Sequence, residues 1–200
     1  QWGARGGLEL VVREQVCIIH EKSDPEQWSD TERYSAIMSA DNVHHNGYWL
    51  DGNGHAFDLE LSAALVNFFG PGASVLDLGC GKGEYVSTMR ACGLDAQGVD
   101  GNPLTPTFNP HCEIADLTKP LLYPVADWVL CLEVGEHVPI HHSDILFDNI
   151  DRHNRVGVAI SWAIPGQPGR RHINLQPNEW VEEKMAARGY TRDREAESTL

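Results

Sequence analysis

The sequence predicts a single α/β domain built on a doubly wound, mostly parallel sheet. Short apolar segments alternate with helical segments from residue 56 onward. The apolar segments show little polar alternation, which is typical of strands covered by helices on both faces. With 200 residues, the chain is long enough for one domain with one sizeable core. We therefore expect residues 56–200 to form one globular unit and residues 1–55 to form an N-terminal extension or lid.

The individual elements follow from apolar spacing and from helix stop signals. Apolar side chains recur at helical spacing over residues 57–69, and the Gly70-Pro71-Gly72 turn ends that helix. Further helices are expected at residues 84–92, 143–152 and 177–189. Strands are expected at residues 74–78, 96–99, 112–117, 128–132 and 156–162.

Both ends of the chain are harder to interpret. Residues 8–19 predict either a strand or a helix, and residues 28–38 predict a short helix. Residues 41–55 are rich in His, Asn, Gly and aromatic residues without an apolar period, which indicates a structured loop. A start at Gln1 is consistent with removal of a leader or of a longer N-terminus. After Tyr190 there is no apolar alternation, so either the chain is truncated or the sheet edge is completed differently.

The amino-acid composition argues against two kinds of partner, nucleic acids and membranes. The chain has 15 basic and 29 acidic residues and a formal net charge of −14. A protein this acidic repels phosphate backbones, so no nucleic-acid partner is expected. No apolar run approaches the roughly 18 residues that span a bilayer, so no membrane segment is expected within the chain. The five cysteines form no CxxC pair, which favours reduced thiols and a cytoplasmic location. The oligomeric state stays open.

The most informative segment joins the strand at residues 74–78 to the following helix. It reads Asp77-Leu78-Gly79-Cys80-Gly81-Lys82-Gly83, and its glycines allow a sharp turn and a close approach to a ligand. Asp100 ends the next strand, where it is placed to accept hydrogen bonds from a ribose diol. Glu84 stands where the dinucleotide fingerprint has its third glycine, and a carboxylate there would face a pyrophosphate. The pattern instead suits a ligand with a cationic sulfonium and an amino group.

With these motifs, residues 56–190 resemble the class I S-adenosylmethionine-dependent methyltransferases. The resemblance implies a Rossmann-like fold that usually finishes with a sixth strand and an antiparallel seventh; the last edge strand is not evident here. It also implies S-adenosyl-L-methionine as cofactor and S-adenosyl-L-homocysteine as product. Twelve residues are expected at the cofactor: Asp77, Gly79, Cys80, Gly81, Gly83, Asp100, Gly101, Asn102, Asp116, Leu117, Glu133 and His55. Among them, Asp116 and Leu117 match the adenine site, and His55 with Tyr48 is expected to cover the methionine end.

A second motif predicts the acceptor side. Residues 133–138 read Glu-Val-Gly-Glu-His-Val, which is similar to the E-V-x-E-H-V/I segment that follows the fourth strand in many small-molecule methyltransferases. The resemblance makes Glu136, His137 and His172 the candidate catalytic residues, with Asn174 and Trp162 close by. Methyl transfer itself is an in-line displacement that depends mainly on positioning. We expect a small polar acceptor, and His137 or His172 is placed to orient it or to take its proton.

Less specific interpretations remain open. The glycine loop could be a turn without a ligand, Asp100 a solvated strand-end acid, and Asp116 a helix cap. Glu133 and Glu136 could be surface acids, and Glu136 or His137 could cap the next helix. A non-catalytic methyltransferase-like binding or partner module is the alternative function, and an NAD-dependent enzyme is disfavoured by Glu84. The ten histidines include no HExxH motif and no HxxxH pair on an expected helix, so no functional metal is expected.

Overall fold

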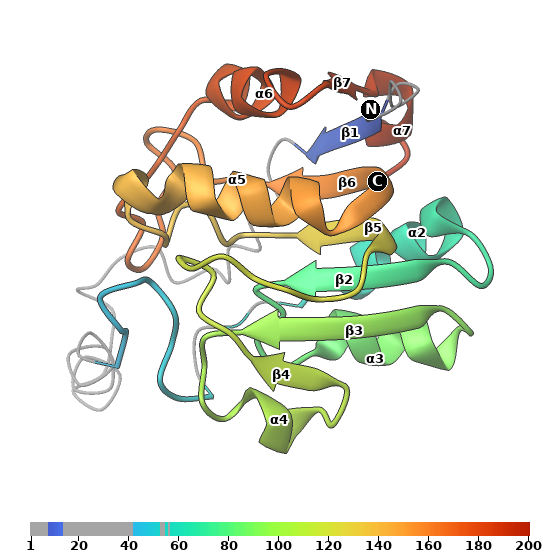
Figure 1. Ribbon diagram of the computed structural model, residues 1–200, viewed down its shortest axis with the longest axis horizontal. Coiled ribbons are helices and arrows are strands. Elements are labelled where there is room, and N and C mark those ends of the chain that lie inside the picture. Colours follow the sequence, from blue (N-terminus) through green and yellow to red (C-terminus); the bar gives the residue numbers. More distant parts are fainter. Residues whose placement is uncertain (1–7, 14–41, 53–54, 56) are drawn as a thin grey trace, which may run out of the picture.

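Parallel strands organise the whole described chain. The computed structural model describes residues 8–13, 42–52, 55 and 57–200 (Figure 1). The described residues form a seven-stranded parallel sheet in the order β4-β3-β2-β5-β6-β1-β7. The strands are β1 (Leu8–Arg13), β2 (Ser74–Leu78), β3 (Asp95–Asp100), β4 (Cys112–Ile114), β5 (Ala126–Cys131), β6 (Asn154–Ser161) and β7 (Tyr190–Arg192).

Helices connect these strands and cover the sheet. They are α2 (Leu59–Phe69), α3 (Glu84–Ala91), α4 (Thr105–Phe108), α5 (Ser143–Arg152), α6 (Asn178–Ala186) and α7 (Arg194–Glu197), with a 3-10 turn η2 (Ile140–His142) before α5. No helix in the described part of the chain is long and apolar enough to cross a membrane. The predicted helix at residues 28–38 and the cysteine at position 17 lie outside the described residues.

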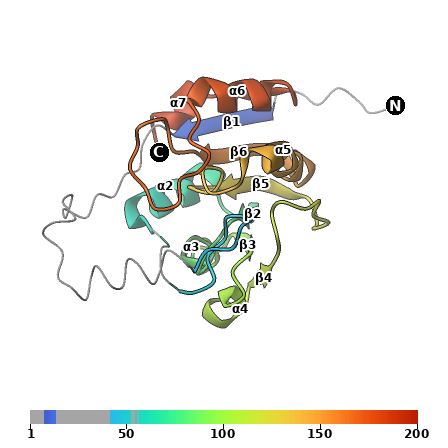
Figure 2. The same ribbon diagram turned by 90° about the vertical axis from the view of Figure 1, so that its left-hand side faces the viewer.

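The sheet has a separate apolar core on each face, as a doubly wound sheet requires. Val75 of β2 packs in the core that holds Leu65 of α2 and Val86 of α3. The next residue, Leu76, belongs to the opposite core with Leu146 of α5 and with α6. Adjacent strand residues point to opposite faces, so one short apolar strand supplies both cores. Figure 2 shows α2 and α3 on the other side of the sheet from α5.

The far edge of the sheet is completed by the two ends of the chain. β1 lies between β6 and β7, with Leu10 opposite Val158 on one side and opposite Arg192 on the other. Residues 8–13 are therefore a strand, whereas the rest of the range 8–19, for which the sequence predicts either a strand or a helix, lies outside the described residues. In the described residues β7 pairs with β1 in parallel, whereas the resemblance implies an antiparallel last strand. β7 is only three residues long, too short to show an apolar pattern.

Element boundaries differ from the predictions at a few places. The strand expected at residues 112–117 ends at Ile114, because Asp116 instead forms a turn in which it accepts hydrogen bonds from Thr118. Pro177 stands before α6 as its N-cap and not inside the helix. In each strand through β6 the carboxyl end lies at the same edge of the sheet (Figure 1). Open α/β sheets bind ligands at this edge, and the predicted site residues follow these strand ends.

Candidate functional site

A pocket of about 360 Å³ lies at the carboxyl ends of the strands. Eleven of the predicted site residues line it: Asp77, Gly79, Cys80, Gly81, Asp100, Gly101, Leu117, Glu133, His55, His137 and His172. Four predicted residues do not line it: Gly83, Asn102, Asp116 and Glu136. The pocket therefore brings together residues that follow β2, β3, β5 and β6 and residues from the segment 42–58.

The glycine loop after β2 is shaped by close contacts within the protein. Gly79 and Gly81 have φ angles of 88° and 55°, in the left-handed region that favours glycine. A Cβ on Gly79 would lie 2.3 Å from Cγ2 of Val134, and one on Gly81 would lie 2.5 Å from Nδ1 of His55. Neighbouring side chains thus occupy the space that these glycines leave free. Gly83 instead caps the start of α3 and packs against Cys112.

Asp100 at the end of β3 holds the glycine loop in place. Its Oδ2 accepts the Gly81 N–H at 2.8 Å, and its Oδ1 accepts the Asn102 N–H at 2.8 Å. Burial raises the pKa of the Asp100 carboxyl, while these two donors and His55 act in the opposite direction. Asn102 is fully buried, and its side-chain amide donates to the Asp51 carbonyl. Asn102 therefore supports the loop through Asp100 without lining the pocket, whereas the Asp100 carboxyl also lines the pocket.

Asp77 is a buried carboxyl group that lines the pocket. Its exposed fraction is 3%, and its Oδ2 makes no hydrogen bond with any residue that the structure describes. Burial and the negative charge of Asp100 raise the pKa of Asp77 to about 8. An unsatisfied buried polar atom is costly, so a donor bound in the pocket would stabilise this arrangement.

The segment 42–52 packs over the ends of β3 and β4. Asn46 donates to Oδ2 of Asp116 at 2.8 Å, and the ring of Tyr48 occupies the space above Gly101. Burial acts to raise the pKa of Asp116, but hydrogen bonds from Thr118 and Asn46 lower it overall. Asp116 therefore fixes this segment to the sheet edge, while its neighbour Leu117 lines the pocket.

Two segments that are far apart in sequence meet across the pocket. The guanidinium of Arg170 lies 4.8 Å from the ring centre of Trp49, in cation–π geometry. Both residues line the pocket, and sequence reasoning missed both. The sequence indicated only that each lies in a loop. It held no signal that would pair the loop after β6 with the segment 42–52.

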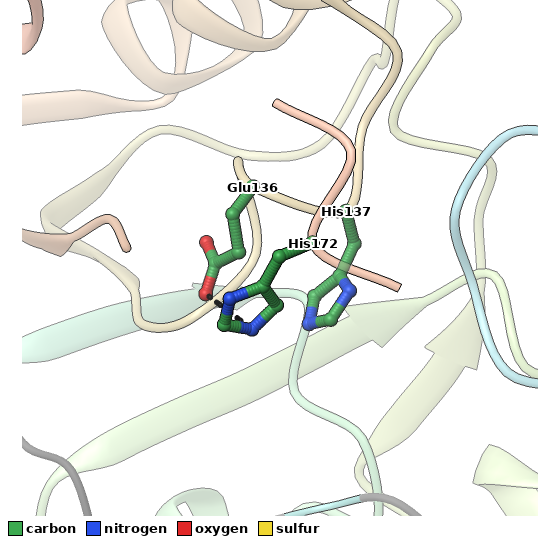
Figure 3. A group of neighbouring side chains, drawn as sticks. All are labelled: Glu136, His137 and His172. Carbon is green, nitrogen blue, oxygen red and sulfur yellow. Dashed lines mark ion pairs between the residues drawn. The ribbon is translucent and has the colours of Figure 1, made fainter. Parts of the chain in front are cut away.

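Figure 3 shows the three candidate catalytic residues, Glu136, His137 and His172, close together. Nε2 of His172 lies 4.0 Å from Oε1 of Glu136, which is fully buried. Nδ1 of His137 lies 3.2 Å from the Arg171 carbonyl. A carbonyl can only accept, so Nδ1 carries the proton and Nε2 keeps its lone pair. Burial and the neighbouring His172 lower the pKa of His137 to about 4, so this imidazole is neutral at physiological pH.

Glu133, which begins this segment, has an unusual backbone that a serine holds in place. Its φ angle is 55°, in the left-handed region. The Glu133 N–H donates to the Ser161 hydroxyl at 2.8 Å, and that hydroxyl donates to Oε1 of Glu133 at 2.8 Å. Burial and the Glu133 carboxylate together raise the pKa of Glu136 to about 8. Ser161 lines the pocket and was not predicted, because a serine at a strand end carries no specific signal.

Asn174 and Trp162 lie beside Gly135 in this segment but do not line the pocket. The side-chain amide of Asn174 lies within hydrogen-bond distance of the Gly135 carbonyl, the Val138 carbonyl and the Ser143 hydroxyl. Trp162 donates from Nε1 to the Asn174 carbonyl at 2.7 Å. Both side chains are buried and hold the loop after β5 in place.

Solved structures share this fold. A methyltransferase from Synechocystis PCC 6803 that acts on magnesium protoporphyrin IX, solved with bound SAH, has 18% identity and a TM-score of 0.55. The match covers 65% of this chain and 72% of that one. A TehB-like SAM-dependent methyltransferase from Corynebacterium glutamicum has 17% identity and a TM-score of 0.53, with 78% and 79% of the two chains covered.

A third solved structure is matched over less than two thirds of its own chain. It is described as a methyltransferase from an antibiotic biosynthesis pathway of Anabaena variabilis, with 17% identity and a TM-score of 0.55. The match covers 66% of this chain and 62% of that chain. No curated protein matches the sequence.

A family model gives the assignment. The model described as "Methyltransferase domain" matches residues 53–184, which is more than half of the chain. That range includes the glycine loop, Asp100, the Glu133–His137 segment and His172. The chain therefore belongs to the methyltransferase-domain family, and it has the Rossmann-like fold of the class I S-adenosylmethionine-dependent enzymes.

Proposed function

We propose that this protein transfers a methyl group from S-adenosylmethionine to a small polar acceptor. One observation supports this most strongly: a single pocket contains both the glycine loop with Asp100 and the two imidazoles of His137 and His172. A cofactor placed by the loop would thus extend toward groups that can orient an acceptor.

The cofactor end of the pocket suits the chemistry of S-adenosylmethionine. Leu117 offers an apolar surface for the adenine, and Asp100 a carboxylate for the ribose hydroxyls. The unsatisfied Oδ2 of Asp77 suits the cationic amino group of the methionine part, with Glu133 further along the pocket. The bound cofactor supplies a methyl group on a sulfonium, which is a strong electrophile.

The acceptor end suits a small polar molecule. A pocket of about 360 Å³ has little room for a large acceptor once the cofactor is in place. The neutral His137 can orient an acceptor or take its proton through Nε2, and Arg170 adds a polar group at the Trp49 side. The net charge of −14 disfavours a polyanionic acceptor.

Cofactor binding is tested by calorimetric titration with S-adenosylhomocysteine. Wild-type protein should bind it, and Asp100→Asn should bind it about 10- to 100-fold more weakly, because a hydrogen bond to a charged acceptor contributes about 1.5–3 kcal/mol. Asp95→Asn, which changes an exposed carboxylate at the other end of β3, should bind normally. Folded wild-type protein that does not bind at millimolar ligand would contradict the proposal.

Catalysis is tested by cofactor turnover against a panel of amines, phenols, thiols and carboxylates. Turnover with at least one acceptor is expected, with a lower rate in His137→Ala and in His172→Ala. If both variants keep full turnover, the assignment of the acceptor side is wrong. Binding of S-adenosylhomocysteine without turnover on any acceptor would favour the alternative, a non-catalytic binding or partner module.

A further inference from the structure

We propose that Glu136, His137 and His172 form a binding site for a divalent first-row transition-metal ion at the acceptor end of the pocket. Each residue offers one ligand atom, and these atoms lie within 4.8 Å of one another (Figure 3). Two imidazole nitrogens and one carboxylate oxygen are a donor set that suits Zn²⁺, Mn²⁺, Fe²⁺ or Co²⁺. The inference goes beyond methyl transfer, since ion binding can be measured without cofactor or acceptor.

Glu136 is the first reason to expect a cation. Its side chain is fully buried, and neither carboxyl oxygen has a hydrogen bond of good geometry within 3.5 Å among the described residues, although the Glu133 carboxyl and the Ala163 backbone lie close to it. Within the same residues, no lysine or arginine forms an ion pair with Glu136 or with the neighbouring Glu133. Burying a carboxyl group whose oxygens lack good hydrogen bonds is costly. A bound cation would supply the missing partner.

The histidines are oriented as metal-binding histidines are. The Nδ1–H of His137 donates to the Arg171 carbonyl, which fixes the ring and leaves the Nε2 lone pair available. Such a second hydrogen bond to a backbone carbonyl is characteristic of imidazole ligands. Nδ1 of His172 has no hydrogen-bond partner among the described residues, whereas the ring also makes a hydrogen bond with the Gln167 backbone, and its Nε2 lies 4.0 Å from Glu136. The two rings meet edge to face with 5.1 Å between centroids.

The distances leave room for an ion. Bonds of about 2.0–2.2 Å place the ligand atoms of one ion about 3–3.5 Å apart. Movements of about 1 Å by these side chains would therefore complete the coordination. His137 and His172 line the pocket whereas Glu136 does not, so the remaining coordination positions would face the pocket. A site with three protein ligands and an open position can also bind an acceptor through a lone pair.

Neighbouring histidine pairs provide a matched control. His141 and His142 lie with ring centroids 4.1 Å apart, and His44 and His45 with centroids 4.0 Å apart. Neither pair belongs to a group of three possible ligands in the part of the chain that the structure describes. His141→Ala therefore removes an exposed histidine that could bind ions adventitiously and leaves the proposed site intact.

The experiment uses the full chain, stripped of metal with a chelator and dialysed. Co²⁺ is then added, and both its visible absorption and its stoichiometry are measured; Zn²⁺ is titrated in competition. Wild type and His141→Ala are expected to bind one Co²⁺ per chain with the absorption of a nitrogen- and oxygen-ligated ion. His172→Ala and Glu136→Gln are expected to weaken this binding by more than about 100-fold, since loss of a ligand exceeds the 10- to 100-fold effect of losing a ligand's hydrogen-bond partner.

Three results would overturn the proposal: no binding by wild type at millimolar Co²⁺ or Zn²⁺, unchanged binding in His172→Ala, or loss of binding in His141→Ala. Circular dichroism checks that each variant is folded. If Glu136→Gln does not fold, His172→Ala decides the outcome, because its side chain lies at the pocket surface. Titration of the same samples with S-adenosylhomocysteine separates failure of the metal site from failure of the proposed function.

Discussion

Glycines with a positive φ angle differ in whether neighbouring atoms also constrain them. Gly81 and Gly72 both have positive φ angles, 55° and 76°. A Cβ on Gly81 would meet His55, whereas a Cβ on Gly72 would meet nothing within 4 Å. The two positions therefore separate the cost of backbone strain from the cost of a steric clash.

We expect Gly72→Ala to lower the free energy of unfolding by about 1–2 kcal/mol, the cost of a left-handed backbone at a non-glycine residue. Gly81→Ala should cost about 1–3 kcal/mol more, because the new methyl group would overlap His55. Urea denaturation measures both. The double variant Gly81→Ala/His55→Ala should recover part of the extra cost. Equal destabilisation by the two alanines would contradict the close contact.

Asp77 should make stability depend on pH. Its pKa is about 8 in the folded protein and near 3.8 when unfolded, so the folded state binds more protons between these values. The contribution of Asp77 to the free energy of unfolding is therefore largest below about pH 4. It decreases as pH rises, by at most about 1.4 kcal/mol per pH unit, and stops changing above about pH 8. Urea denaturation at several pH values should show a flatter dependence in Asp77→Asn. The same slope in both proteins would exclude Asp77 as its source.

At the scale of elements, a buried asparagine joins the loop after β6 to the loop after β5. Asn174 has three oxygens around its amide and also accepts a hydrogen bond from Gln176. We expect Asn174→Ala to lower the free energy of unfolding by about 2–4 kcal/mol, because buried carbonyls lose their donor. Ile173→Ala, next to it but exposed, should cost much less. Thermal denaturation compares them, and a similar change in both would show that Asn174 is not a structural link.

The elements differ in how far the sequence could predict them. β2 has the predicted bounds and α5 the predicted range, because their apolar spacing and flanking residues are local signals. For Glu136, His137 and His172, the sequence predicted only that they lie on the same side of the sheet. Their distances depend on the loop after β6, whose path Asn174 and Arg170 fix through contacts that are remote in sequence. The same holds for Trp49 and Ser161, which no pattern singled out.

For the whole molecule, β1 is the element that connects β7 to the rest of the sheet. Val11 of β1 pairs with Ala159, and Leu8 pairs with Tyr190. A proline in the interior of a strand removes a backbone donor from the sheet. We expect Val11→Pro to increase hydrogen exchange in β6 and β7 and to lower the denaturation temperature. Unchanged exchange in Val11→Pro would contradict the pairing of β1.

Val134 connects the two ends of the pocket. Its side chain fills the space above Gly79, and it stands in the same short segment as Glu136 and His137. Any ligand that moves this segment also changes how Val134 packs against Gly79 in the glycine loop. Occupancy at one end should then be thermodynamically linked to affinity at the other, and the linkage is reciprocal: whatever factor Co²⁺ applies to the affinity for S-adenosylhomocysteine, S-adenosylhomocysteine must apply to the affinity for Co²⁺. The amide resonance of Gly79 would report both events in solution.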